Sequence, residues 1–277
     1  MTSPVYAVTA AVLNSRKYQA IAPELVEAIA AAELGKGRSP KEAVKATKNQ
    51  LHQSAAVYQS GRMEYPRWLA DLQDAWPDGA ARQPLLRRLL TAHTSTSERL
   101  PFLDDFYNRI FALLPPIRSV LDIACGLNPL ALPWMPLVAD ASYLAVDIFS
   151  DQIAFLNDFF RLAGVSGRGE TRNVLTDCPT EPVDLALILK TIPCLEQIEK
   201  EAGAKLLGQI QAHHLVVSFP SRTLGGRRKG MESTYAAHFA ELTEGWDATI
   251  TRLDFANEMV FVVERGDGSE GGSVSAG

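Results

Sequence analysis

The strongest constraint on the fold is an alternation, from residue 117 onward, of short apolar segments with amphipathic ones. Residues 183–189 (VDLALIL) are apolar along nearly their whole length, which is typical of a parallel strand buried on both faces. We expect strands at 117–124, 142–147, 168–173, 183–189 and 215–219, and helices at 150–163, 195–211 and 232–242. Residues 248–255 and 259–264 fit a closing hairpin. The pattern predicts a doubly wound, Rossmann-like α/β fold with a seven-stranded, mostly parallel sheet.

The first 92 residues contain helical patterns and no strand pattern. The expected helices are 21–34, 39–61, 67–76 and 84–93. The second begins at a capping box, with Ser39 at the N-cap and Glu42 three residues later. A second capping box, Ser95 to Glu98, is expected to start an amphipathic helix that ends at residues 115–116. We predict an all-helical N-terminal domain at 1–92, a catalytic domain at 93–265 and a disordered Gly/Ser-rich tail at 266–277.

The net charge of −5 hides an asymmetry between the two ends of the chain. Residues 1–67 contain nine Lys or Arg and five Glu, a net charge of +4, which leaves −9 for the remainder. Such an asymmetry can mark a region that faces nucleic acid, but on charge alone a helical segment with ordinary solvated lysines is the favoured interpretation. In the expected second helix, Lys41, Lys45, Lys48 and His52 follow one another at spacings that place them on one side.

Cysteine usage and hydropathy bear on the compartment. The three cysteines are an odd number and widely spaced, which argues against a disulfide framework or a zinc site and favours a reducing cytoplasm. We expect no signal peptide, because residues 5–13 are a short apolar run without a basic segment before it. No segment approaches the length of a membrane span, and we expect no membrane partner and no metal.

The loop after the first strand carries the clearest binding signal. The strand ends at Asp122 and enters a tight turn with one glycine, Gly126, and Asn128, a residue type that tolerates the left-handed backbone. The second strand ends at Asp147, where a carboxylate suits the two hydroxyls of a ribose. A dinucleotide loop contains three glycines, so a nucleoside without a pyrophosphate fits better. The combination favours an S-adenosylmethionine-dependent methyltransferase.

Two other reactive groups in this half favour structural roles. Cys125 lies beside Gly126, but no histidine is placed to activate it as a nucleophile. His213 and His214 precede the fifth strand without a matching set of metal ligands.

Four strings together resemble a known family. They are HTSTSERL at 93–100, DIACGLNPLALPWM at 122–135, LKTIPCLEQ at 189–197 and SFPSRTLGGRRKGM at 218–231. In this order they resemble the aminoglycoside-resistance 16S rRNA (guanine-1405-N7) methyltransferases, and the resemblance covers nearly the whole chain. It implies methylation of one guanine N7 in the decoding-site helix of the assembled 30S subunit. It also implies resistance to 4,6-disubstituted deoxystreptamines such as kanamycin and gentamicin.

The resemblance also implies roles for individual residues. Arg99 would hold the methionine carboxylate, Gly126 would lie against the methionine, and Asp147 with Ile148 would hold the ribose. Asn173 and Val174 would meet the adenine, although relatives often have an acid where this chain has Asn173. The full cofactor set, for S-adenosylmethionine and its product S-adenosylhomocysteine, is His93, Ser95, Thr96, Arg99, Asp122, Ala124, Gly126, Asp147, Ile148, Asn173, Val174, Leu189 and Gln197.

The resemblance also places residues at the target guanine. Lys190, Arg222, Arg228 and Met231 would position it. From the charge pattern, we expect RNA contacts from Arg16, Lys17, Lys41, Lys45, Lys48, His52, Arg222, Arg227, Arg228 and Lys229. Because N7 has a free lone pair, we expect no catalytic acid or base, only proximity and orientation.

Three alternatives remain open at this stage. The chain is a small-molecule methyltransferase, it methylates a nearby rRNA adenine, or it is an RNA-binding protein whose cofactor site has decayed. We expect the protein to be a monomer.

Overall fold

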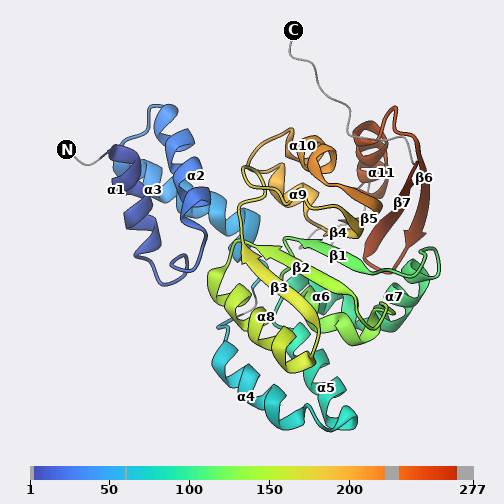
Figure 1. The fold of residues 1–277 in the computed structure, drawn as a ribbon. Helices are drawn as coiled ribbons and strands as arrows, with labels where there is room; N and C mark the ends of the chain where they lie inside the picture. The colour runs from blue at the N-terminus through green and yellow to red at the C-terminus, as the bar shows by residue number, and fades with distance from the viewer. Residues whose placement is uncertain (1–2, 60, 222–230, 267–277) are drawn as a thin grey trace.

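The computed structural model describes residues 3–59, 61–221 and 231–266. Its centre is a seven-stranded sheet with the order β3-β2-β1-β4-β5-β7-β6 (Figure 1). All seven expected strands are present, the third beginning two residues earlier than expected, and β7 runs antiparallel to both of its neighbours. The strands are β1 (Ser119–Ile123), β2 (Ser142–Asp147), β3 (Ser166–Thr171), β4 (Val183–Leu189), β5 (Ala212–Pro220), β6 (Ala248–Asp254) and β7 (Glu258–Arg265). The Rossmann-like, mostly parallel sheet is therefore confirmed.

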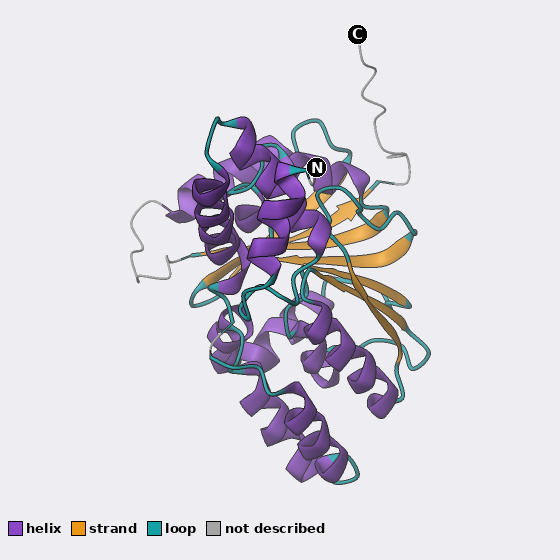
Figure 2. Ribbon diagram, turned by 90° about the vertical axis from the view of Figure 1, so that its left-hand side faces the viewer, coloured by secondary structure: helices purple, strands orange, loops and turns teal. Residues whose placement is uncertain are grey.

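Helices cover both faces of the sheet (Figure 2). One face, which includes Val120 and Tyr143, packs on a layer formed by α4 (Tyr65–Ala75), α5 (Gly79–Leu90), α7 (Leu103–Phe111) and α8 (Ser150–Ala163). The other face, which includes Leu121 and Leu144, packs on α10 (Ala202–Gln209) and α11 (Met231–Leu242). Neighbouring residues of a strand thus enter different cores, as the two-residue period of a strand requires.

The N-terminal helices α1 (Pro4–Leu13), α2 (Pro23–Gly35) and α3 (Pro40–Leu51) have a core of their own. Phe149, which follows β2, is buried in that core and joins it to the sheet domain. Helices α4 and α5 instead share a core with the sheet. The helical region therefore consists of an outer unit before residue 57 and a hairpin of helices that lines the sheet.

Several helix boundaries differ from expectation. The capping box at Ser39 is confirmed, with both reciprocal hydrogen bonds present. The one at Ser95 is wrong, because α6 (Thr94–Arg99) has His93 as its N-cap and begins two residues earlier. The Thr94 N–H donates to the Tyr58 carbonyl, which fixes the entry of the chain. The helix expected from residue 84 begins at Gly79, capped by the Asp78 carboxylate.

Two helices that were expected to be long are each divided into shorter elements. The α-helix from Pro40 ends at Leu51 and continues as a π-helical turn, η1 (His52–Ala56). The helix expected over 195–211 is two shorter ones, α9 (Ile192–Leu195) and α10. No helix in the described part of the chain is long and apolar enough to cross a membrane.

Candidate active site

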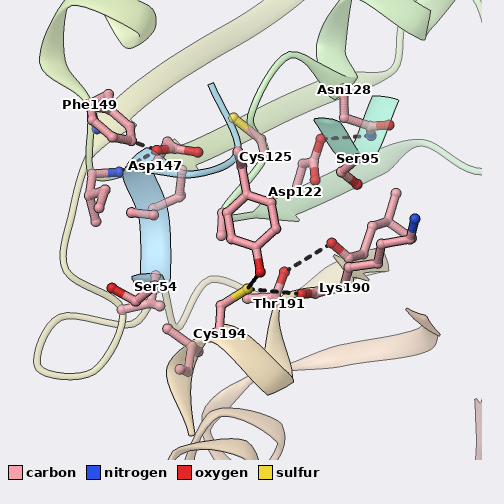
Figure 3. Close-up of a pocket in the computed structure, with 18 of the residues that line it drawn as sticks. Ser54, Ser95, Asp122, Cys125, Asn128, Asp147, Phe149, Lys190, Thr191 and Cys194 are labelled. Atoms are coloured by element: carbon pink, nitrogen blue, oxygen red, sulfur yellow. Dashed lines mark hydrogen bonds between the residues drawn. The ribbon is translucent and has the colours of Figure 1, made fainter. Parts of the chain in front are cut away.

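A cavity lies at the carboxyl ends of β1, β2 and β4, with an empty volume of about 990 Å³ that includes its mouth. Its walls come from the loops after these strands, from α6 and from the N-terminal unit. In Figure 3, Asp122 and Asn128 lie on one side of the space, Asp147 and Phe149 on another, and Lys190, Thr191 and Cys194 on a third. This is where open α/β sheets bind their ligands.

The turn after β1 needs glycine at position 126 for two reasons. Gly126 has a φ of +51°, in the left-handed region, and a Cβ there would lie 2.9 Å from the His93 ring. The Gly126 N–H donates to Asp147 Oδ2 at 2.8 Å, so the turn is tied to the end of β2. The non-glycine residue in the left-handed region of this turn is Ala124, not Asn128. Such strain at a cavity wall is typical of functional sites.

Asp147 accepts hydrogen bonds from three backbone N–H groups. Besides Gly126, its carboxylate accepts from Ile148 N at 2.7 Å and from Phe149 N at 3.3 Å. Burial raises the pKa of Asp147, and these N–H groups oppose the rise by stabilising the charge. Oδ2 accepts only one of the three bonds, so it retains a lone pair for a ligand hydroxyl.

Asp122 lies deeper, at the end of β1. Its Oδ2 accepts from the Tyr143 hydroxyl at 2.6 Å and from Asn128 Nδ2 at 2.9 Å. Burial raises the pKa of Asp122 to about 7, against the opposing effect of these two hydrogen bonds.

The raised pKa of Asp122 predicts a pH dependence of stability. A carboxyl whose pKa is higher in the folded state stabilises the fold below its unfolded pKa and loses that contribution as pH rises toward about 7. Relative to Asp122→Asn, wild type should lose roughly 1 kcal/mol of unfolding free energy per pH unit between pH 5 and 7. Urea unfolding at several pH values measures this. Asp140→Asn, at an exposed position, is the matched control, and equal trends for Asp122→Asn and wild type would contradict the prediction.

Two cationic side chains, Arg99 and Lys190, lie in the cavity wall, and each is paired with a carboxylate. The Arg99 guanidinium is 1% exposed and donates to both oxygens of Glu258, from Nε at 3.2 Å and from Nη2 at 2.7 Å. Lys190, which follows β4, has a φ of +59°, and its Nζ is 2.7 Å from Glu98 Oε2. Glu258 is completely buried and its role was not foreseen, because it belongs to the terminal hairpin.

The outer N-terminal unit completes the cavity, which the sequence did not suggest. Leu25 of α2, Ser54 and Ala55 of η1, and Tyr58 all line it. The Ala22 N–H donates to the Ile148 carbonyl, next to Asp147, and Tyr58 stacks on the His93 ring with 6.3 Å between ring centroids. Burial lowers the pKa of His93 to about 4, so the ring is neutral at physiological pH.

Most of the predicted cofactor residues lie together in this wall. Eleven of the thirteen line the cavity: His93, Ser95, Thr96, Arg99, Asp122, Ala124, Asp147, Ile148, Asn173, Val174 and Leu189. Gly126 lies behind the His93 ring. Gln197 is exposed and outside the wall, and its carbonyl accepts from Gln50 Nε2.

Further lining residues had gone unpredicted. They are Asn128, Val146, Phe149, Arg172, Leu175, Thr191, Cys194, Leu195 and Ile198, together with Cys125 and the four N-terminal residues. Several directly follow strands β2, β3 and β4, so the strand ends themselves were the available signal. Burial raises the pKa of the Cys125 thiol well above its ordinary value, which fits a structural residue.

The predicted RNA-contact residues divide into two groups. Arg16, Lys17, Lys41 and Lys45 are exposed on the outer unit. Lys48 hydrogen-bonds to the Ser15 hydroxyl, and Lys17 Nζ is 3.0 Å from His52 Nδ1, so the segment between α1 and α2 lies beside the end of α3 and the start of η1. Arg222, Arg227, Arg228 and Lys229 are outside the described residues, and Met231 is the first residue of α11.

Comparisons with known proteins agree along nearly the whole chain. A family model described as "Ribosomal RNA methyltransferase (FmrO)" matches residues 14–262. A 16S rRNA (guanine(1405)-N(7))-methyltransferase of Frankia casuarinae is 41% identical over 263 residues, 92% of this chain and 91% of the relative. The enzyme of the same name from Micromonospora echinospora is 38% identical over 260 residues, 92% of this chain and 94% of the relative.

Solved structures show the same fold. The crystal structure of the 16S rRNA methyltransferase RmtF in complex with S-adenosyl-L-homocysteine matches with a TM-score of 0.84 and 33% identity, covering 96% of this chain and 100% of that one. The 16S rRNA methylase RmtB matches with a TM-score of 0.78 and 31% identity, covering 95% and 98%.

Proposed function

This chain belongs to the FmrO family of ribosomal RNA methyltransferases, and on that premise we propose that it methylates N7 of guanine 1405 in 16S rRNA, with S-adenosylmethionine as the methyl donor. The observation that carries the proposal is the cavity at the carboxyl ends of β1 and β2, where Asp122, Asp147 and Arg99 lie in one wall. Such methylation is typical of aminoglycoside resistance, and we propose that the chain protects ribosomes from kanamycin and gentamicin.

The residues of the cavity fit S-adenosylmethionine. The wall is mainly apolar where a base would lie, with Ile148, Val174, Leu175 and Ile198. Asp147 retains a lone pair for a ribose hydroxyl. Asn173 uses its side-chain oxygen to accept from the Leu175 N–H at 3.2 Å, which leaves the amide nitrogen as a donor toward a base nitrogen. We propose these residues as the adenosine site and Arg99 as the partner of the methionine carboxylate.

The chemistry requires orientation rather than proton transfer. The bound cofactor supplies an electrophilic methyl on a sulfonium, and guanine N7 has a lone pair that attacks it without prior deprotonation. The chain must therefore hold N7 in line with the methyl and exclude water, which contributes several kcal/mol. We propose that Lys190, Arg222, Arg228 and Met231 position the guanine at the mouth of the cavity.

The RNA surface is proposed to include the basic residues of the outer unit, Arg16, Lys17, Lys41, Lys45, Lys48 and His52, together with Arg227 and Lys229. Phosphate contacts there would position the enzyme and offset the cost of flipping the base, about a few kcal/mol. We propose the assembled 30S subunit as the substrate, the cytoplasm as the compartment and a monomer as the active form.

Labelled methyl transfer tests the function. Purified protein and radiolabelled S-adenosylmethionine are incubated with 30S subunits, with free 16S rRNA or with a set of small metabolites, and the modified nucleotide is mapped by mass spectrometry. We expect label at N7 of guanine 1405 in the subunit. Label in an adenine or in a metabolite would support the alternative enzymes, and absence of cofactor binding in calorimetry would indicate a decayed site.

A further inference from the structure

The terminal hairpin places one carboxylate, Glu258, beneath the cavity wall. Glu258 is the first residue of β7, is 0% exposed and does not line the cavity itself. Its carboxylate accepts hydrogen bonds from Arg99 Nε and Nη2, and the Ser218 hydroxyl donates to Oε1 at 2.6 Å. Lys190 Nζ is 3.4 Å from its other oxygen. Burial would raise the pKa of Glu258, but Arg99 and Lys190 outweigh it and hold the pKa below its ordinary value.

The two cations depend on Glu258 to different degrees. Lys190 has a closer carboxylate in Glu98, at 2.7 Å, whereas Arg99 has Glu258 as its ion-pair partner among the described residues. A side-on, two-point pair fixes the plane of a guanidinium as well as its position. The pair spans 159 residues of sequence, from α6 to the terminal hairpin.

This pairing leaves part of the guanidinium available for a ligand. Arg99 has five N–H groups, and it uses two for Glu258 and one, on Nη1, for Asn128 Oδ1 at 3.2 Å. The Tyr107 hydroxyl oxygen also accepts from the guanidinium, which leaves at least one N–H without a partner among the described residues, and Arg99 belongs to the cavity wall. With its aromatic neighbour Phe106, whose ring centroid is 4.4 Å from Cζ, the guanidinium is held on three sides.

We propose that Glu258 is the positioning residue that orients Arg99 to bind the carboxylate of the methyl donor. The inference rests on the proposed function, because the carboxylate belongs to the methionine part of that donor. It assigns to the last hairpin a role in cofactor recognition, although no residue of the hairpin lines the cavity. The fixed guanidinium offers its remaining N–H capacity without first losing rotational freedom, which is the usual benefit of preorganisation.

Two ligands that differ only in the carboxylate test the proposal. Calorimetry gives Kd values for S-adenosylhomocysteine and for its decarboxylated analogue with wild type, Glu258→Gln and Glu258→Asp. In Glu258→Gln the preference for the carboxylate ligand should fall about tenfold or more, as expected for a charged hydrogen bond, while the affinity for the analogue stays within about twofold. Glu258→Asp keeps the charge on a shorter side chain and should retain an intermediate preference for the carboxylate ligand. This variant tests the proposal if Glu258→Gln does not fold.

The control and the contrary outcomes are defined by the same measurement. Glu264→Gln, an exposed residue of the same strand, should keep the wild-type preference. If substitution at Glu258 weakens both ligands equally, or leaves or increases the preference, Glu258 has no positioning role and the proposal is overturned. If wild type itself binds neither ligand, the proposed function has failed, which is a separate result.

Discussion

Replacing Arg99 with methionine is expected to lower the free energy of unfolding by about 3–5 kcal/mol, because it strands a fully buried carboxylate. Glu258 would lose its two-point partner and keep only Lys190, 3.4 Å away, and the Ser218 hydroxyl. Methionine fills much of the same volume beside Phe106, so the loss reports the charge rather than a cavity. Urea unfolding followed by circular dichroism measures it.

A matched control separates the buried pair from ordinary arginine contacts. Arg109 also lies over an aromatic ring, that of Phe255 at 4.6 Å, and pairs with Asp105, but it is exposed. Arg109→Met should cost less than about 1 kcal/mol. Equal costs for the two substitutions would contradict the prediction. The double variant Arg99→Met with Glu258→Leu should recover stability without recovering affinity for S-adenosylhomocysteine, since an apolar pair replaces the ion pair but not the ligand contact.

Reversing the charge of Lys45 is expected to remove most methylation of the 30S subunit while leaving cofactor binding unchanged. Lys45 is exposed on α3, in the outer unit, and is not a lining residue of the cavity. A glutamate there would repel RNA phosphates at a surface whose affinity depends on them. We expect at least roughly a tenfold loss in the rate of methyl transfer at sub-saturating subunit concentration, an effect of about 1.4 kcal/mol or more.

The control is the same substitution on another surface. Lys205, on α10, is exposed and pairs with Glu199, and Lys205→Glu should leave methylation near wild type. Calorimetry with S-adenosylhomocysteine should give wild-type affinity for both variants. Bacteria that express Lys45→Glu should be sensitive to kanamycin, and undiminished resistance would exclude the outer unit as an RNA surface. We expect the same outcome for Arg228→Glu, at a position outside the described residues.

The architecture of the sheet could be read from the sequence because its signals are local. Continuous apolar segments and intervening amphipathic ones have fixed periods, and they gave the positions of the strands and the terminal hairpin. Helix ends were less predictable. Thr94 is fixed by a hydrogen bond from a distant segment, and the chain after Leu51 changes to π-helical geometry where it enters the cavity wall. Contacts of this kind are not contained in a local pattern.

The candidate site shows the same division. Asp122, Gly126 and Asp147 were identifiable because a doubly wound fold places strand ends together, and Gly126 is required by its φ and by the His93 ring. Asn128 was expected for its backbone tolerance. Its side chain instead joins Asp122 to Arg99, with Oδ1 accepting from Arg99 and from Tyr107.

By itself the sequence determined the positions of the strands along the chain, the cofactor-binding strand ends and the family resemblance. Only the tertiary structure revealed that Glu258, 159 residues after Arg99, is its partner, and that Ser54 and Tyr58 complete a cavity otherwise built from the sheet domain. The physical reason is that periodicity specifies which face of an element is buried. The packing of whole layers decides which distant charge or ring contacts that buried face. A buried cation such as Arg99 requires a partner, which can come from any part of the chain.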